Sequence, residues 1–263
     1  AGVVRAAQGA TFDYGSNVVG YGVIDTPADS EFPLVVNGNI RGNSLTEPVT
    51  LTGYVQGAGT LDNCLILGVD APGMSSASVR RGSVEYAGTL EIEIGGTLAG
   101  VGYDQVSHTL ADGIASLGGR LDVILTGGYS PSLGDEFRIL NAKTREGEFS
   151  EVVLPDLTAA LQWNIAYDPS GVSLRVAATG DFDADGDVDG ADFLTWQRGQ
   201  SSTPGSWDDF LAWEASFGYF ASSEQLLTSV PEPSTFAGAA LLLVLQGFCC
   251  RCAGTRFSTS KPL

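Results

Sequence analysis

Six aspartates lie within twelve residues in the last third of the chain, and their spacing could hold a metal ion. They occupy positions 1, 3, 5, 7, 9 and 12 of that stretch, as Asp181, Asp183, Asp185, Asp187, Asp189 and Asp192. Calcium takes about six to eight oxygen ligands, so several carboxylates must converge from one short loop. Gly186 stands at position 6, where such a loop bends sharply, and the apolar Val188 at position 8 can anchor the loop to a core. The pattern therefore predicts a calcium-binding loop.

The later positions have distinct expected roles in that loop. Asp187 would offer its backbone carbonyl, Asp189 would act through a water molecule, and Asp192 would close the ligand shell. The alternative is a solvated acidic linker. Glycine at position 6 and an apolar residue at position 8 favour the metal loop over that alternative.

A helix is expected directly after the loop, and its sequence recurs once. Residues 191–197 (ADFLTWQ) return as residues 208–214 (DDFLAWE). Four aromatic side chains at matching positions should pack the two helices together: Phe193, Trp196, Phe210 and Trp213. Residues 199–207, ahead of the second helix, hold no carboxylate. This second loop is therefore not expected to bind calcium.

The loop and its helix resemble the calcium-binding repeat of dockerin type I modules. Asp192 stands where the EF-hand consensus has Glu, and aspartate at that position matches the dockerin pattern. The resemblance implies a small two-helix module that binds Ca²⁺. Dockerins bind cohesin through Ser and Thr positions of their helices, and only Thr195 matches those positions here. We therefore expect a self-contained, calcium-stabilised spacer rather than a cohesin-binding module.

The first 178 residues are expected to form many short strands. Leu90, Ile92 and Ile94 alternate with Glu91 and Glu93, which is the two-residue period of a half-buried strand. Residues 163–167 and 172–176 flank the turn sequence Asp-Pro-Ser-Gly and predict a hairpin. Residues 104–116 are expected to form a short helix.

Two architectures remain open for this Gly-rich β body, a β-solenoid and a β-sandwich. The tripeptide Gly-Thr-Leu occurs at 59–61, 88–90 and 96–98, and repeated turn-strand units are what a solenoid requires. The irregular period leaves the sandwich possible. Residues 88–176 resemble the passenger-like β repeats of bacterial surface and autotransporter-type proteins.

The last part of the sequence has the composition of a membrane segment. Val230, Pro231, Glu232 and Pro233 precede an apolar run at 235–250, and Arg251 opens a basic tail. The run is near the lower limit of the ~17–25 residues that span a bilayer, and the bases after it place the tail in the cytoplasm. The sequence therefore predicts a single C-terminal transmembrane helix at 235–250.

The order of these features closely resembles the PEP-CTERM sorting signal of Gram-negative bacteria. The resemblance covers residues 230–251 and implies export, anchoring in the inner membrane and recognition by an exosortase-type membrane transpeptidase. After sorting, the protein would reside at the cell surface or outside the cell. The combination of a dockerin-like calcium loop and such a signal resembles that of exported planctomycete-type proteins.

Composition excludes several classes of function. With 13 basic against 31 acidic residues, the net charge is −18, which excludes a phosphate-neutralising nucleic-acid surface. The single histidine, His108, is expected on the surface or in a turn, and Cys64 is expected to be buried as a small apolar group. Glu91 and Glu93 could form a glycosidase carboxylate pair, although outward-facing strand residues are commoner. No convincing catalytic residues emerge.

Together these features divide the chain into four parts. They are a mainly β body (1–178), a dockerin-like calcium module (179–219), a linker (220–229) and the sorting signal (230–263). The expected function is that of an exported, non-enzymatic cell-surface or matrix protein with a structural or adhesive role. The alternative is a protein that acts on or binds polysaccharide and carries a dockerin module.

Overall fold

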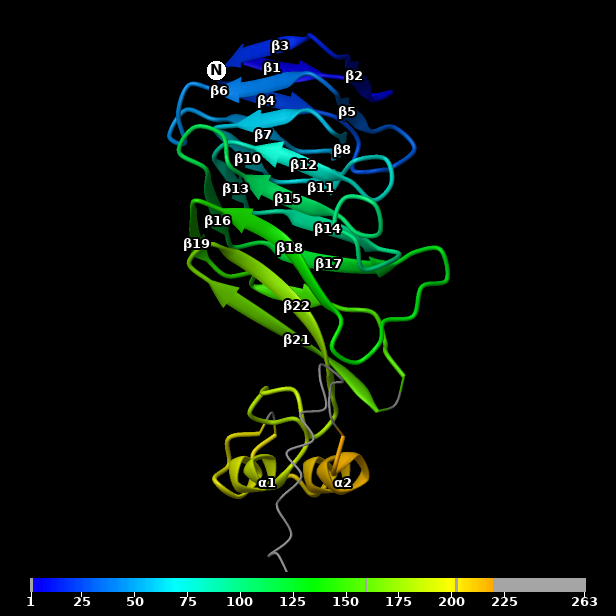
Figure 1. Ribbon diagram of the computed structural model, residues 1–263. Helices are drawn as coiled ribbons and strands as arrows, with labels where there is room; N and C mark the ends of the chain where they lie inside the picture. Colours follow the sequence, from blue (N-terminus) through cyan, green and yellow to red (C-terminus); the bar gives the residue numbers. More distant parts are fainter. Residues whose placement is uncertain (1, 159, 202, 220–263) are drawn as a thin grey trace, which may run out of the picture. The chain divides into compact units, whose positions relative to one another are not determined.

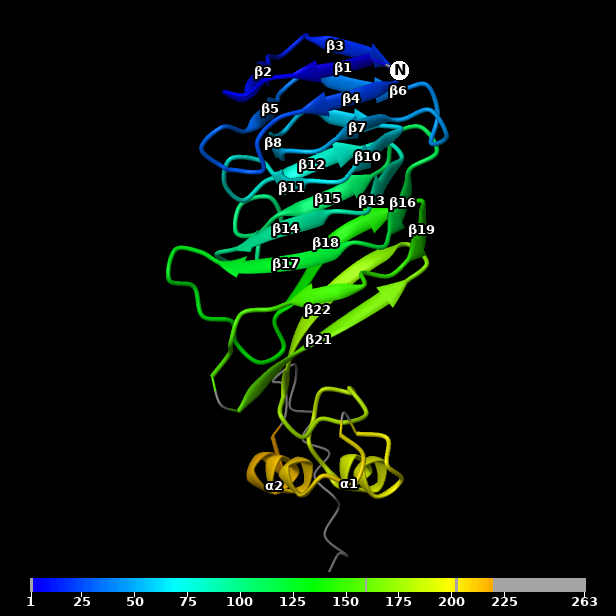
Figure 2. The same ribbon diagram turned by 180° about the vertical axis from the view of Figure 1, so that it is seen from behind.

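The computed structural model describes residues 2–158, 160–201 and 203–219, and this part of the chain is mainly β (Figures 1 and 2). It contains 22 strands followed by two short helices. One sheet of seven strands has the order β1 (Gly2–Arg5), β4 (Gly22–Asp25), β7 (Val49–Leu51), β10 (Cys64–Ile66), β13 (Val84–Tyr86), β16 (Ile114–Leu117) and β19 (Thr144–Gly147). A second has the order β2 (Ala10–Phe12), β5 (Leu34–Val36), β8 (Tyr54–Gly57), β11 (Val69–Pro72), β14 (Thr89–Ile94), β17 (Arg120–Leu125) and β20 (Glu151–Val153).

Two smaller sheets complete the β body. One contains β3 (Asn17–Gly20), β6 (Asn39–Gly42) and β9 (Thr60–Asp62). The other has the order β12 (Ser78–Arg81), β15 (Gln105–His108), β18 (Glu136–Ala142), β22 (Gly171–Ala178) and β21 (Leu161–Asp168). The hairpin expected around residues 168–171 is confirmed, because β21 and β22 pair antiparallel with Asp168 opposite Gly171.

Nearly all strand pairs in the body are parallel, and each joins a strand to the one three elements later. In this way β1 pairs β4, β4 pairs β7, and β11 pairs β14. The antiparallel strand pairs both involve β22, which pairs with β18 and with β21. Such stacking is compatible with a solenoid-like body, whereas sandwiches are built from antiparallel sheets.

The core consists of inward-facing side chains stacked in ladders. Leu90, Ile92 and Ile94 of β14 are buried, and Leu90 and Ile92 pair with the buried Leu121 and Val123 of β17. The intervening Glu91 and Glu93 are half-exposed. The alternation predicted for this strand is therefore confirmed, and it places the apolar face inside the stack.

A column of glycines lets successive rungs approach one another at one corner. A Cβ on Gly88 would lie 2.1 Å from the carbonyl oxygen of Gly68, and one on Gly119 would lie 1.9 Å from that of Gly88. Neither position can hold a side chain without moving backbone. The Gly-Thr-Leu repeat at 88–90 thus marks a corner where the next strand begins.

The prediction of a helix over residues 104–116 is wrong. This stretch forms β15 and the beginning of β16, joined by a turn in which Gly113 has φ +61°. His108, expected on the surface, is fully buried in β15. The segment that contains His108 is short and mostly polar, so the sequence does not indicate a buried strand. The strand is buried because strands of neighbouring rungs cover it.

Two polar pairs lie inside the β body. Arg81 and Asp70 form a fully buried ion pair at 3.1 Å. His108 Nδ1 lies 2.8 Å from the Gly82 carbonyl and must donate to it, so Nε2 accepts from the Tyr86 hydroxyl at 3.1 Å. Cys64 is buried, as expected.

The two helices follow the β body in sequence, as α1 (Gly190–Gln197) and α2 (Trp207–Ser216). The four predicted aromatic residues contact one another, with Phe193 and Trp213 rings 4.9 Å apart and Trp196 and Phe210 rings 5.3 Å apart. No helix in the described residues is long and apolar enough to cross a membrane. The predicted membrane helix (235–250), Val230, Pro231, Glu232, Pro233 and Arg251 lie outside the described residues.

The glycine column gives a first test. Gly119→Ala should lower the free energy of unfolding by about 1–3 kcal/mol, because the new methyl group meets the Gly88 backbone. The neighbouring Gly118 is the matched control, since a Cβ there has its nearest neighbour at 3.9 Å. Denaturant unfolding followed by circular dichroism measures both. Equal stabilities of the two variants would contradict the close approach.

The buried histidine gives a second test, through pH. Burial lowers the pKa of His108 to about 4, below its unfolded value of about 6.5. The unfolded chain therefore takes up a proton between these values while the folded chain does not. This linkage should remove about 3 kcal/mol of stability as the pH falls from 6.5 to 4.

His108→Gln isolates that contribution, because glutamine can keep a donor and an acceptor without titrating. The stability difference between wild type and variant should shrink on acidification. Urea unfolding at several pH values measures it. A difference that stays constant from pH 7 to 4 would show that His108 is not held neutral.

Candidate metal centre

The aspartate loop is positioned by the elements at its two ends. β22 ends at Ala178, only three residues before Asp181, whose amide donates to the Ala178 carbonyl at 3.2 Å. At the other end, the Asp189 side chain caps α1 by accepting from the Ala191 amide at 2.6 Å. A rigid strand and a capped helix therefore fix both ends of the loop.

Asp181 provides the clearest sign that the loop accommodates a cation. Its side chain is buried, with the residue 3 % exposed, and neither carboxylate oxygen accepts a hydrogen bond within the described part of the chain. The same holds for Oδ1 of Asp187. A buried carboxylate without partners is costly, and a bound cation would supply the missing interaction.

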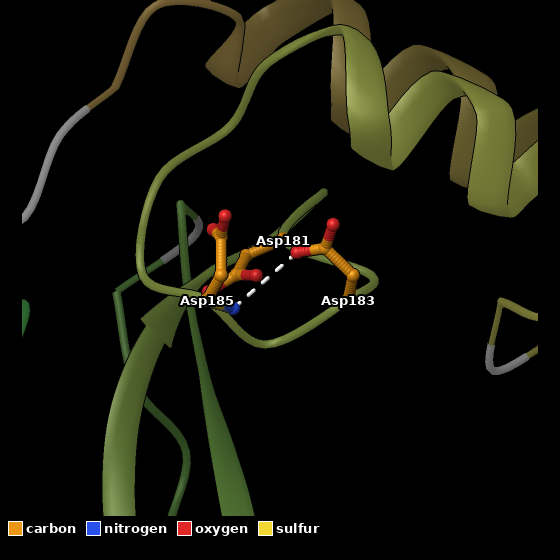
Figure 3. A group of neighbouring side chains, drawn as sticks. All are labelled: Asp181, Asp183 and Asp185. Carbon is orange, nitrogen blue, oxygen red and sulfur yellow. Dashed lines mark hydrogen bonds between the residues drawn. The ribbon is translucent and has the colours of Figure 1, made fainter.

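The six aspartates form two groups of three. Within each group one carboxylate oxygen from each residue lies within 4.8 Å of those of the other two: Asp181, Asp183 and Asp185 form the first group, and Asp187, Asp189 and Asp192 the second. Figure 3 shows the side chains of the first group lying close together in the bend of the loop. Either group could hold a metal ion. A single ligand shell made by all six residues stays a prediction.

Asp192 also organises the loop backbone. Its Oδ1 accepts from the amides of Phe182 at 2.7 Å and Asp183 at 3.2 Å, and its Oδ2 accepts from the amide of Asp189 at 2.8 Å. The last of these completes the capping box of α1. The spacing of the aspartates predicted a metal ligand at Asp192. The structure shows in addition that Asp192 links the start of the loop to its end through hydrogen bonds to backbone amides.

Electrostatics agree with a site built for a positive charge. Burial, followed by repulsion from Asp192 and Asp185, raises the pKa of Asp181 to about 6. Burial and neighbouring carboxylates also raise the pKa values of Asp183 and Asp187. A divalent cation would oppose each of these effects.

The loop backbone adopts the left-handed conformation at two positions. Gly186 has φ +102°, a conformation that favours glycine, and the movable end of the Arg175 side chain lies beside it. Ala184 has φ +61° although alanine disfavours this region. The spacing argument identified Gly186 but not the strain at Ala184.

Sequence reasoning missed three residues that hold the loop from outside. The Trp213 indole donates to the Asp189 carbonyl at 2.7 Å, and Arg175 of β22 reaches the Ala184 carbonyl at 3.4 Å. The backbone of Val188 pairs with that of Tyr219. The repeated helix placed Trp213 in the module, but only the fold brings it to the loop.

The second loop, residues 199–207, holds no carboxylate of its own. It is closed instead by Thr203, whose hydroxyl and amide both bond to the Asp209 carboxylate of α2, at 2.7 and 3.2 Å. Thr195, the one residue that matches the cohesin-contacting pattern, is buried in α1.

Neither a protein-family model nor a curated protein matches this chain.

The strained alanine gives a third test. Ala184→Gly should relieve the left-handed strain and tighten metal binding by about fivefold, which corresponds to about 1 kcal/mol. Isothermal titration calorimetry measures the affinity. Ala191→Gly is the control, because glycine within α1 should weaken the module instead. Weaker binding by Ala184→Gly would contradict the assigned loop conformation.

Proposed function

We propose that residues 181–192 bind Ca²⁺ and thereby stabilise a dockerin-like module in an exported, non-enzymatic surface or matrix protein. The observation that carries the calcium assignment is the buried, unpartnered carboxylate of Asp181 within a group of three aspartates. In this proposal the solenoid-like β body has a structural or adhesive role, and the metal module follows it.

The donor set favours calcium over other metals. All six candidate side chains are carboxylates, and the loop holds neither histidine nor cysteine, the ligands that zinc and copper prefer. Magnesium requires a compact octahedron with several retained waters, whereas calcium accepts many oxygens from a flexible loop. A single twelve-residue segment rich in carboxylates fits the requirements of calcium.

The test is titration of the full chain with Ca²⁺, Mg²⁺ and Zn²⁺ by calorimetry. Calcium should bind with the highest affinity, and Asp181→Asn should weaken it at least about tenfold by removing a buried charge. Asp208→Asn is the matched control, because Asp208 is exposed on α2 outside both groups. Absence of binding at millimolar calcium would defeat the assignment.

The proposed location rests on the C-terminal sequence. Residues 230–251 have the order of a PEP-CTERM signal, which supports export, a membrane helix at 235–250 and an exosortase-type transpeptidase as partner. The acidic body suits solubility outside the cell. Removing residues 230–263 in a host with that sorting system should release the protein from the envelope, as measured by fractionation and immunoblotting. Retention of the shortened chain would contradict the proposal.

A second candidate function, action on polysaccharide, is favoured by one cleft on the β body. This cleft of about 70 Å³ is lined by Tyr54, Glu91, Glu93 and Asp104, among others. Tyr54 donates to Glu91 at 2.6 Å, and burial raises the pKa of Asp104 to about 7. Release of reducing sugars that is lost in Glu91→Gln would support this candidate over the structural role.

A further inference from the structure

The centre of the aspartate loop is hydrogen-bonded to the chain that leaves α2. The Val188 amide donates to the Tyr219 carbonyl at 2.9 Å, and the Gly218 amide donates to the Val188 carbonyl at 2.8 Å. Val188 is fully buried, and its neighbours Asp187 and Asp189 both belong to the second group of aspartates. The pairing residue therefore lies between two candidate ligands.

The end of α2 strengthens this connection. Trp213 donates from its indole to the Asp189 carbonyl at 2.7 Å, and its ring packs on that of Phe217 at 5.0 Å. The Tyr219 amide also bonds back to the Ser216 carbonyl at 3.0 Å. Positions 8 and 9 of the loop are thus held by α2 and by the turn that follows it, so a change in the loop must reach residues 217–219.

On the basis of the proposed function, we propose that metal binding to the loop controls how well ordered the backbone is at Gly218 and Tyr219. Without a cation, the clustered aspartates repel one another and oppose the bend that presents Val188 for pairing. A bound ion removes this repulsion and favours the paired state. Because such coupling is reciprocal, the pairing must also strengthen metal binding.

Hydrogen exchange of the full chain, with calcium or with chelator, tests this directly. Peptides that cover residues 183–190 and 216–219 should exchange at least about tenfold more slowly with calcium. Peptides from β14 and β17 should exchange at the same rate in both conditions. If calorimetry shows calcium binding but peptide 216–219 exchanges equally in both, the inference is overturned while the proposed function stands. If calorimetry shows no binding, the proposed function fails and the inference fails with it.

The reciprocal effect has its own test with two glycines of similar backbone. Gly218 has φ +84° and Gly205 has φ +74°, and neither would meet an atom within 4 Å if a Cβ were added. Gly218→Ala places alanine in a left-handed conformation at a residue that pairs with Val188. Gly205→Ala introduces the same backbone strain in the second loop, away from that pairing. Gly218→Ala should weaken calcium binding at least about threefold more than Gly205→Ala does. Equal affinities of the two variants would overturn the coupling.

Discussion

Parallel strands stack only when successive rungs lie about 4.8 Å apart, and this spacing governs the β body. It leaves no room for a side chain at Gly88 and Gly119 unless the backbone shifts, because one rung's corner rests there on the backbone of another. It also aligns Leu90 with Leu121 and Ile92 with Val123, so the core consists of ladders that no single rung could form. Charged residues such as Glu91 are directed outward by the same alternation.

The stacking of parallel strands gives way to antiparallel pairing at β22, and the aspartate loop begins three residues after this strand ends. Arg175, on β22, lies against Gly186 and reaches the Ala184 carbonyl. The loop therefore starts from a fixed strand. This placement explains how Asp181 can be buried without a hydrogen-bond partner among the described residues: its backbone is held in position by neighbours whose pairing does not depend on its charge.

Polar groups inside this protein fall into two kinds with different consequences. Arg81 and Asp70 neutralise each other within the β body, and His108 is satisfied by Tyr86 and a backbone carbonyl. Asp70 Oδ2 and Arg81 Nε have no hydrogen-bond partner among the described residues, but the opposite charges of this pair lie in direct contact. In the aspartate loop, Asp192 and Asp189 accept backbone hydrogen bonds, but both oxygens of Asp181 and Oδ1 of Asp187 have no partner among the described residues, and residues 181–192 contain no basic residue. The paired groups in the β body favour one packing of the core. The unpartnered carboxylates of the loop would be stabilised by a bound cation.

Local signals in the sequence determined the features that depend on neighbouring residues. The two-residue period of β14, the hairpin at 168–171, the duplicated helices and the spacing of the aspartates all act within a few residues, so they could be predicted. The burial of His108 and the strand at 105–108 could not, because the covering residues come from other rungs. For the same reason, the contacts of Trp213 and Tyr219 with the loop were decided only by the tertiary structure. The hydrogen bonds of Asp192 stay within the loop, but they depend on the backbone conformation of the loop, which the spacing of the aspartates does not specify. Charge and spacing are properties of a segment, whereas burial and pairing depend on which distant segments the fold brings beside it.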